Sequence, residues 1–239
     1  MIRAVFLDVD DTLVDFDAAA RRGHAEVFGD DDGYAQWCSL TPVFWRRFTS
    51  GELDFEAMRR ARMAAYVDAR RDGGSATSAD VFDRDPGELE GRRWSAVEAG
   101  FECYPDVPDC LAALRQQKLL VGVITNNESD HQRRKLATVG LADAFDVVVI
   151  SGEVGVAKPN PEVFRLACRR AGVEPSEAVH VGDLLEIDAA AAVGAGLRGV
   201  WLDRHGIDAS LPEGVTRLET LADLPAWLEQ GRSSDADRP

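Results

Sequence analysis

Short apolar runs rich in β-branched residues recur along the chain, and each run ends at polar residues. These runs cover residues 4–9, 119–124, 147–150, 178–181 and 199–202. Between the later runs, apolar residues recur at helical spacing over 108–118, 129–139, 161–171 and 184–193. Continuous apolar strands that alternate with such helices are typical of a parallel sheet covered on both faces. The pattern therefore predicts an α/β fold with a Rossmann-like core.

The alternation stops between the first and second strands, where a long stretch has helical patterns but no strand run. The helices expected there cover 16–28, 34–50, 55–70 and 86–99, and Asp72-Gly73-Gly74-Ser75 separates the last two. We expect an all-helical cap domain, residues 16–103, inserted into a core made of 1–15 and 104–231. The polar tail 232–239 has nothing to bury and is expected to fray.

Composition limits the classes of partner. The 239 residues include 42 Asp and Glu against 27 Lys and Arg, for a formal net charge of -15. The basic residues stand in short groups among acidic and apolar residues, such as Arg59-Arg60, Arg92-Arg93 and Arg133-Arg134-Lys135, which we interpret as solvated helix faces. Because binding to nucleic acid or anionic lipid depends on clustered Lys and Arg, we expect neither partner.

The cysteines and the start of the chain indicate a cellular compartment. Cys38, Cys103, Cys110 and Cys168 form no Cys-x-x-Cys pair and are expected to be small core residues in a reducing environment. The chain enters its first strand without a charged leader, and no apolar run approaches the ~20 residues of a membrane-spanning helix. We therefore expect a cytoplasmic protein.

Polar residues that are suited to catalysis follow the apolar strands. They are Asp8 and Asp10 after the first strand, Thr125 and Asn126 after the second, Lys158 before the helix 161–171, and Asp183 and Asp188 after the fourth. In doubly wound sheets the ligand site lies beyond the carboxyl ends of the strands. These acids, the hydroxyl and the lysine are therefore expected to converge on one crevice.

The carboxylates predict a metal. Asp8 and Asp10 are two residues apart, so on a strand they share a face, where they repel each other unless a cation is near. With Asp183 from another strand, the natural counterion is Mg²⁺, which prefers oxygen ligands and completes its shell with water and substrate phosphate oxygens. Lys158 adds positive charge, and Thr125 adds a hydrogen-bond donor. Together these groups predict a Mg²⁺-dependent phosphoryl site.

At this point the sequence resembles the haloacid dehalogenase superfamily, in its branch of phosphatases that carry a helical cap after the first motif. The first motif, Asp-x-Asp-x-Thr, matches residues 8–12, and the second, a Ser or Thr that ends a strand, matches Thr125. The third, a Lys ahead of a helix, matches Lys158. The fourth, Gly-Asp-x-x-x-x-Asp, matches residues 182–188. All four occur in order and span nearly the whole chain.

The resemblance implies a two-step hydrolysis of a small phosphorylated metabolite. Asp8 would attack phosphorus to form an aspartyl phosphate, while Asp10 would protonate the leaving oxygen and then activate water. Asp8, the Asp10 carbonyl and Asp183 would hold Mg²⁺, and Lys158 would offset negative charge. Thr125 and the Asn126 N–H would bind phosphoryl oxygens. Asp188 would act behind the metal ligands, although favouring the macrodipole of a helix is an equal alternative for it.

Other activities use similar motifs. A sugar-phosphate mutase would pass the phosphoryl group to another hydroxyl, and the motifs alone separate it poorly from a phosphatase. A haloacid dehalogenase needs no Mg²⁺ but, by the same resemblance, lacks the second Asp of the first motif, which is present here as Asp10. A phosphoryl-binding module without catalysis has no need of Asp8 and Asp10, which would repel its anionic ligand.

Several other patterns are interpreted as structural. Gly194-x-Gly196-x-x-Gly199 matches a dinucleotide fingerprint but follows a helix, which favours a helix-terminal turn. Asp30-Asp31-Asp32 lacks the ligand spacing of a calcium loop, and His180 is expected to pack inside a strand. In the cap, aromatic residues are expected to form a core, and surface placement is preferred to anion binding for three arginines; these residues are Trp37, Phe44, Trp45, Phe48, Phe55, Arg46, Arg47 and Arg62.

Overall fold

The computed structural model describes residues 1–29, 33–72 and 79–236. The chain forms two compact units. The core unit comprises Met1–Asp15 and Glu102–Pro239, and the helical unit comprises Phe16–Phe101. The chain returns from the helical unit to the core unit at Glu102, two residues before residue 104, where the sequence placed this boundary.

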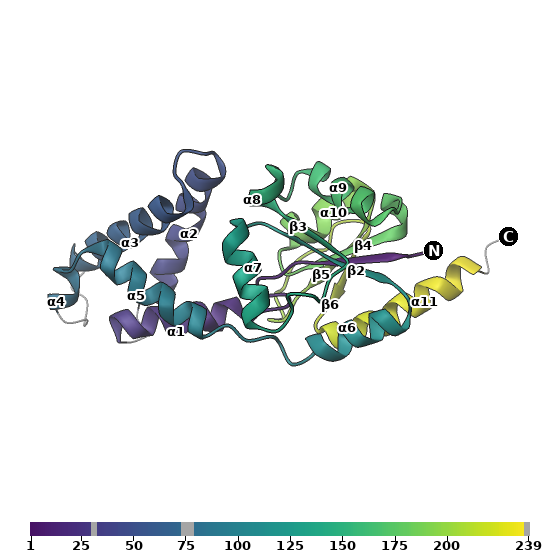
Figure 1. The fold of residues 1–239 in the computed structure, drawn as a ribbon, viewed down its shortest axis with the longest axis horizontal. Helices are drawn as coiled ribbons and strands as arrows, with labels where there is room; N and C mark the ends of the chain where they lie inside the picture. The colour runs from purple at the N-terminus through teal and green to yellow at the C-terminus, as the bar shows by residue number, and fades with distance from the viewer. Residues whose placement is uncertain (30–32, 73–78, 237–239) are drawn as a thin grey trace. The chain divides into compact units, whose positions relative to one another are not determined.

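The core unit contains a six-stranded parallel sheet (Figure 1). Its strands are β1 (Ala4–Leu7), β2 (Leu120–Thr125), β3 (Val147–Ile150), β4 (Ala178–Gly182), β5 (Arg198–Leu202) and β6 (Val215–Leu218). They lie in the order β3-β2-β1-β4-β5-β6, which confirms the predicted α/β class. All four residues of β1 are buried because the strand is central and both faces of the sheet are covered.

Helices lie on both faces of this sheet. The core unit contains α6 (Val107–Gln116), α7 (Ser129–Thr138), α8 (Ser151–Val154), α9 (Pro161–Ala171), α10 (Ala191–Ala195) and α11 (Leu224–Ala236), with the short turns η1 (Pro175–Glu177), η2 (Leu185–Ala190) and η3 (Leu221–Asp223). In Figure 1, α9 and α10 lie on one side of the sheet, and α6 and α11 lie on the other. Val163 and Phe164 of α9 are fully buried in the core cluster on the first side.

Two parts of the core unit differ from expectation. The strand β6 was not predicted because its sequence, Val-Thr-Arg-Leu, mixes apolar and polar residues, as suits a half-buried edge strand. The helix α11 continues to Ala236, whereas the polar composition predicts fraying from residue 232. Residues 237–239 lie outside the described part of the chain.

The helical unit consists of α1 (Phe16–Phe28), α2 (Tyr34–Thr49), α3 (Phe55–Asp72), α4 (Ala79–Phe82) and α5 (Pro86–Ala99). Strands are absent from the described residues of this unit. Gly23 lets α1 approach α5 closely, since a Cβ there would lie 2.4 Å from Val97 Cγ2. Trp37, Phe44 and Phe55 are buried, and Trp45 and Phe48 pack against the second of the two core clusters here, so the expectation that these aromatic residues form a core is confirmed.

The interpretation of the basic groups as solvated is wrong at three positions. Arg59 and Arg93 of the helical unit and Lys135 of α7 are all buried. Glu90 explains why the two arginines can be buried, because its carboxylate pairs with both guanidinium groups, at 2.8 Å from Arg59 Nε and 2.7 Å from Arg93 Nε. Of the four cysteines, Cys110 and Cys168 are buried as expected, but Cys38 is exposed and Cys103 is half-buried.

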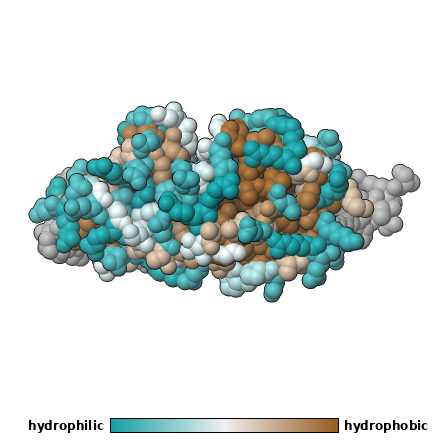
Figure 2. All heavy atoms as spheres, viewed as in Figure 1, coloured by the Kyte–Doolittle hydropathy of each residue, from teal (hydrophilic) through white to brown (hydrophobic). Residues whose placement is uncertain are grey.

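Figure 2 shows that hydrophilic residues cover most of the visible face of the helical unit, while the visible face of the core unit also carries an apolar area. Within the described ranges, no helix has both the length and the apolar character needed to cross a membrane.

Candidate active site

The predicted site residues of β1 and β4 meet because these two strands are neighbours in register. Leu7 at the end of β1 pairs with Val123 of β2 and with Val181 of β4. The next residue, Asp8, donates its backbone N–H to Val181 O at 2.9 Å. Asp8 therefore lies at the carboxyl edge of the sheet, beside Gly182 and Asp183.

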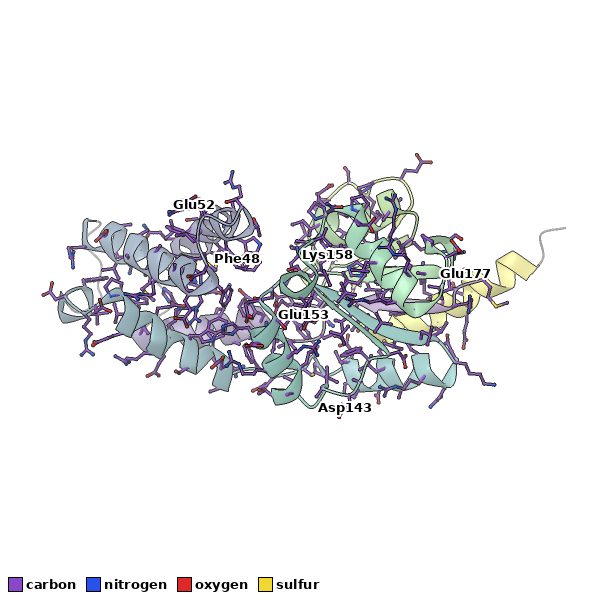
Figure 3. All side chains as sticks on the ribbon, turned by 45° about the horizontal axis from the view of Figure 1, so that its top comes forward. Phe48, Glu52, Asp143, Glu153, Lys158 and Glu177 are labelled. Atoms are coloured by element: carbon purple, nitrogen blue, oxygen red, sulfur yellow. The ribbon has the colours of Figure 1, made fainter. Side chains whose placement is uncertain are left out.

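Three carboxylates converge at this edge. Oxygens of Asp8, Asp183 and Asp188 lie within 4.8 Å of one another. Lys158, which Figure 3 labels, lies between α8 and α9 and contacts two of them. Its Nζ donates to Asp8 Oδ1 at 2.7 Å and to Asp188 Oδ1 at 2.6 Å. The structure thus brings together four of the residues that the sequence singled out.

Asp188 is held by groups of its own segment. The Leu184 N–H donates to Asp188 Oδ2 at 3.0 Å, and His180 Nε2 lies 3.2 Å from Asp188 Oδ1. A Cβ at Gly182 would lie only 2.3 Å from Asp188 Cγ, so the carboxylate occupies space that a glycine leaves open. His180 is fully buried and packs edge-on against Phe164, which agrees with its predicted role in packing.

Burial and mutual repulsion dominate the electrostatics of the cluster. Burial raises the pKa of Asp8 to about 6 although Lys158 opposes this, and it raises the pKa of Asp183 to about 9, with the charges of Asp8 and Asp188 adding to the effect. Burial also acts on Asp188, but Lys158 and His180 outweigh it and lower the pKa of that carboxyl. For Lys158, the effect of burial is outweighed by Asp188 and Asp8, so its pKa is raised.

The cluster fits a hard divalent cation. Three carboxylates face one ammonium group, and burial together with the repulsion among the carboxylates raises the pKa of Asp8 and of Asp183, an effect that a bound cation would oppose. All three side chains offer oxygen, the donor that Mg²⁺ prefers. The side chain of Asp10 is not part of this cluster, because α7 engages it.

Gln132 and Lys135 of α7, which sequence reasoning missed, contact the predicted residues Asp10 and Thr125. Lys135 Nζ forms an ion pair with Asp10 Oδ1, and Gln132 Nε2 donates to Asp10 Oδ2 at 3.0 Å and to Thr125 Oγ1 at 2.7 Å. Both side chains of α7 are buried. The available signal was their spacing of three residues, which places them on one helix face.

Asn126 fixes the backbone of Lys158 through its side chain. Its Nδ2 donates to Lys158 O, and its Oδ1 accepts from Lys158 N, both at 2.8 Å. The peptide bond between Lys158 and Pro159 is cis. The sequence assigned only the backbone N–H of Asn126 to the site, so this contact of its side chain is an additional finding.

The remaining sequence candidates lie elsewhere or have structural explanations. Gly196 follows α10 with a φ of 97°, so the glycine pattern forms a helix-terminal turn as predicted. In the helical unit, Arg46 is exposed, Arg47 Nε pairs with Glu52 at 2.8 Å, and Arg62 Nη1 donates to Thr41 at 3.1 Å. Residues Asp30, Asp31 and Asp32 lie outside the described part of the chain.

Comparison with known proteins gives relatives that are similar along nearly the whole chain. The pyrimidine 5'-nucleotidase YjjG of Escherichia coli is 29% identical over 227 residues, covering 92% of this chain and 93% of the relative. The human N-acylneuraminate-9-phosphatase is 28% identical and covers 95% and 94%. A phosphoserine phosphatase of Thermus thermophilus is 44% identical, but over only 47% of this chain and 45% of the relative.

Solved structures share the fold. The magnesium-bound HAD-hydrolase YfnB of Bacillus subtilis aligns with a TM-score of 0.75 at 24% identity, covering 95% of this chain and 98% of the other. A 2-haloacid dehalogenase of Pseudomonas syringae aligns with a TM-score of 0.64 at 28% identity, covering 97% and 100%. Residues 2–196 match the model of the haloacid dehalogenase-like hydrolases. The chain therefore belongs to the haloacid dehalogenase-like hydrolase family.

Proposed function

We propose that this hydrolase is a Mg²⁺-dependent phosphatase that cleaves a small phosphomonoester through an aspartyl phosphate on Asp8. The observation that carries the proposal is the cluster of Asp8, Asp183 and Asp188 around the ammonium group of Lys158. Such a cluster has the oxygen donors for a divalent cation and a fixed positive charge beside the nucleophile. Relatives that are named as phosphatases of nucleotides and sugar phosphates support this substrate class.

The residues divide the chemistry as follows. Asp8 and Asp183 would hold Mg²⁺ together with the Asp10 carbonyl, and Asp188 would orient Lys158 from behind. The bound cation supplies charge neutralisation for the phosphoryl oxygens. Lys158 keeps Asp8 ionised for attack, and the Thr125 hydroxyl donates to a phosphoryl oxygen. Asp10 gives its proton to the leaving oxygen and then takes one from the water that attacks the aspartyl phosphate.

Phosphate release from p-nitrophenyl phosphate tests the proposal. We expect turnover with Mg²⁺, loss of turnover with EDTA and recovery when Mg²⁺ is added in excess. Asp8→Asn should abolish turnover. Glu88→Gln, which removes an exposed carboxylate of α5, should leave turnover unchanged. Absence of phosphate release in the parent protein, or equal rates for the parent and Asp8→Asn, would contradict the proposal.

The same samples separate the competing activities. A mutase would interconvert a sugar bisphosphate and its isomer without releasing phosphate, and a dehalogenase would release halide from a 2-haloacid in EDTA. A panel of nucleoside monophosphates, sugar phosphates and phosphorylated amino acids, assayed at equal concentration with Mg²⁺, then identifies the leaving group that the enzyme prefers.

A further inference from the structure

One face of α7 carries two buried polar residues that no motif of the family assigned. Gln132 and Lys135 are three residues apart, so their side chains leave the helix on the same side. Their exposed fractions are 0% and 1%, whereas Arg133 and Arg134 between them are exposed. Burial of an ammonium group costs free energy unless a partner offsets it. The placement of Lys135 therefore depends on what it contacts.

That contact is the carboxylate of Asp10. Lys135 Nζ pairs with Asp10 Oδ1, while Gln132 Nε2 donates to Asp10 Oδ2 at 3.0 Å. Each carboxylate oxygen has two lone pairs, so the two donors of α7 fix the carboxylate plane and still leave one lone pair on each oxygen. A proton can therefore be held or accepted by Asp10 without displacing either donor.

Gln132 also connects Asp10 to the end of β2. Its Nε2 has two hydrogens, and the second one is directed to Thr125 Oγ1 at 2.7 Å. Asn127 Nδ2 lies 3.4 Å from Gln132 Oε1, which fixes the orientation of the amide. One amide group thus connects Asp10, which follows β1, with Thr125, the last residue of β2.

We propose that Lys135 and Gln132 are positioning residues that align the Asp10 carboxyl group for proton transfer; this rests on the proposed phosphatase function. In the first step the Asp8 oxygen bonds to phosphorus, the bond from phosphorus to the leaving oxygen breaks, and the Asp10 proton moves to that oxygen. In the second step a water oxygen bonds to phosphorus, its proton moves to Asp10, and the bond to Asp8 breaks. Both proton movements need the Asp10 oxygens at a fixed place.

The test compares two substrates that differ in their need for a proton. The leaving group of p-nitrophenyl phosphate departs readily as an anion, whereas that of benzyl phosphate is a strongly basic alkoxide. The ratio kcat/KM reports the steps up to formation of the aspartyl phosphate. We expect Lys135→Met to lower kcat/KM for benzyl phosphate at least about tenfold more than for p-nitrophenyl phosphate, because general acid catalysis contributes roughly 10² to 10⁴ in rate.

Two further variants distinguish positioning from folding. Lys135→Arg keeps the charge and should recover part of the benzyl phosphate activity, and Gln132→Met removes the amide while keeping the length of the side chain. Arg134→Met is the matched control, since it removes the same charge from an exposed neighbour on α7. It should leave kcat/KM unchanged for both substrates. If Lys135→Met does not fold, Gln132→Met carries the same comparison.

The possible outcomes separate the two proposals. An equal loss for both substrates in Lys135→Met and Gln132→Met, or no loss, overturns the positioning role and leaves the phosphatase function intact. If the parent protein hydrolyses neither substrate, the proposed function fails, and the positioning role fails with it. A selective loss for benzyl phosphate with partial recovery in Lys135→Arg supports the positioning role.

Discussion

At the scale of single residues, the candidate site depends on groups that carry no reactive chemistry of their own. Gly182 has no side chain where Asp188 needs space, and the amide of Asn126 holds the backbone of Lys158. Gln132 and Lys135 do the same for Asp10. The candidate site residues follow from the sequence motifs, whereas these supporting contacts depend on tertiary distances that a motif does not contain.

Gly182→Ala tests the space around Asp188. The added Cβ would lie 2.3 Å from Asp188 Cγ, so either the carboxylate or β4 must move. We expect a loss of about 1–3 kcal/mol in the free energy of unfolding, measured by urea denaturation, and a lower kcat. Gly194→Ala is the control, because nothing lies within 4 Å of its Cβ and it is inside α10, where alanine should be neutral or stabilising by about 0.5–1 kcal/mol. Equal stability of the two variants would contradict this explanation.

Asn126→Ala tests the support of Lys158. Loss of the two hydrogen bonds to the Lys158 backbone should cost about 1–3 kcal/mol of stability and reduce phosphatase turnover, because the Nζ would no longer be held between Asp8 and Asp188. Asn160→Ala removes the hydrogen bond that caps α9 and should cost about 1 kcal/mol while leaving turnover unchanged. A parallel loss of turnover in both variants would show that destabilisation alone is responsible.

At the scale of elements, the success of the sequence prediction depended on how each element is buried. Strands β1, β2, β4 and β5 are mostly apolar and mostly buried, so continuous apolar runs identified them. The edge strand β3 was identified as well because all four of its residues are apolar, although two of them are only half-buried. The edge strand β6 mixes polar and apolar residues and was missed. Lys135 was misassigned because it was grouped with its neighbours Arg133 and Arg134 along the sequence, while its helical periodicity groups it with Gln132. Asp10, the partner of Lys135, is distant in sequence, so the local sequence pattern could not predict that Lys135 is buried in an ion pair.

Between α3 and α5, Arg59 is likewise buried by a partner that is distant in sequence, Glu90, and this contact gives a prediction with pH dependence. Glu90 is buried between Arg59 and Arg93, and although burial alone would raise its pKa, the arginines outweigh burial and lower it. Glu90→Gln leaves two buried guanidinium groups without their counterion, and breaking such a pair costs about 3–5 kcal/mol. Urea denaturation at neutral pH measures this loss, and Glu88→Gln, exposed on the same helix, should change little.

The pH dependence follows from the sign of this shift. Because the pKa of Glu90 is lower in the folded protein than in the unfolded chain, its contribution is complete above the unfolded value of about 4.3 and is lost as the pH falls through the folded value. The difference in stability between the parent and Glu90→Gln should therefore be constant near neutral pH and shrink in acid. A difference that grows on acidification would contradict the assigned sign.

At the scale of the whole molecule, the net negative charge of the protein contrasts with the positive charge that an anionic substrate needs at the site. The formal charge of -15 opposes binding of anions, yet the proposed substrate is an anion. The charge at the site must therefore be positive although the net charge of the protein is negative, and a divalent cation held by Asp8 and Asp183, with the nearby Lys158, would make it so. The proposed substrate binding should consequently depend on the metal more strongly than it does on the overall charge of the protein.

Metal binding can be measured without turnover, because the two units have separate cores and the helical unit serves as an internal control for the core unit. All three clustered carboxylates belong to the core unit, so Mg²⁺ should slow amide hydrogen exchange in β1 and β4 and leave the helical unit largely unaffected. A ligand at a hundredfold excess over its Kd stabilises the state that binds it by about 2.7 kcal/mol. Hydrogen exchange followed by mass spectrometry, with and without Mg²⁺, measures the difference. Asp183→Asn should remove the effect in β1 and β4, whereas Mg²⁺ protection that is equal in both units, or that survives Asp183→Asn, would place the cation elsewhere.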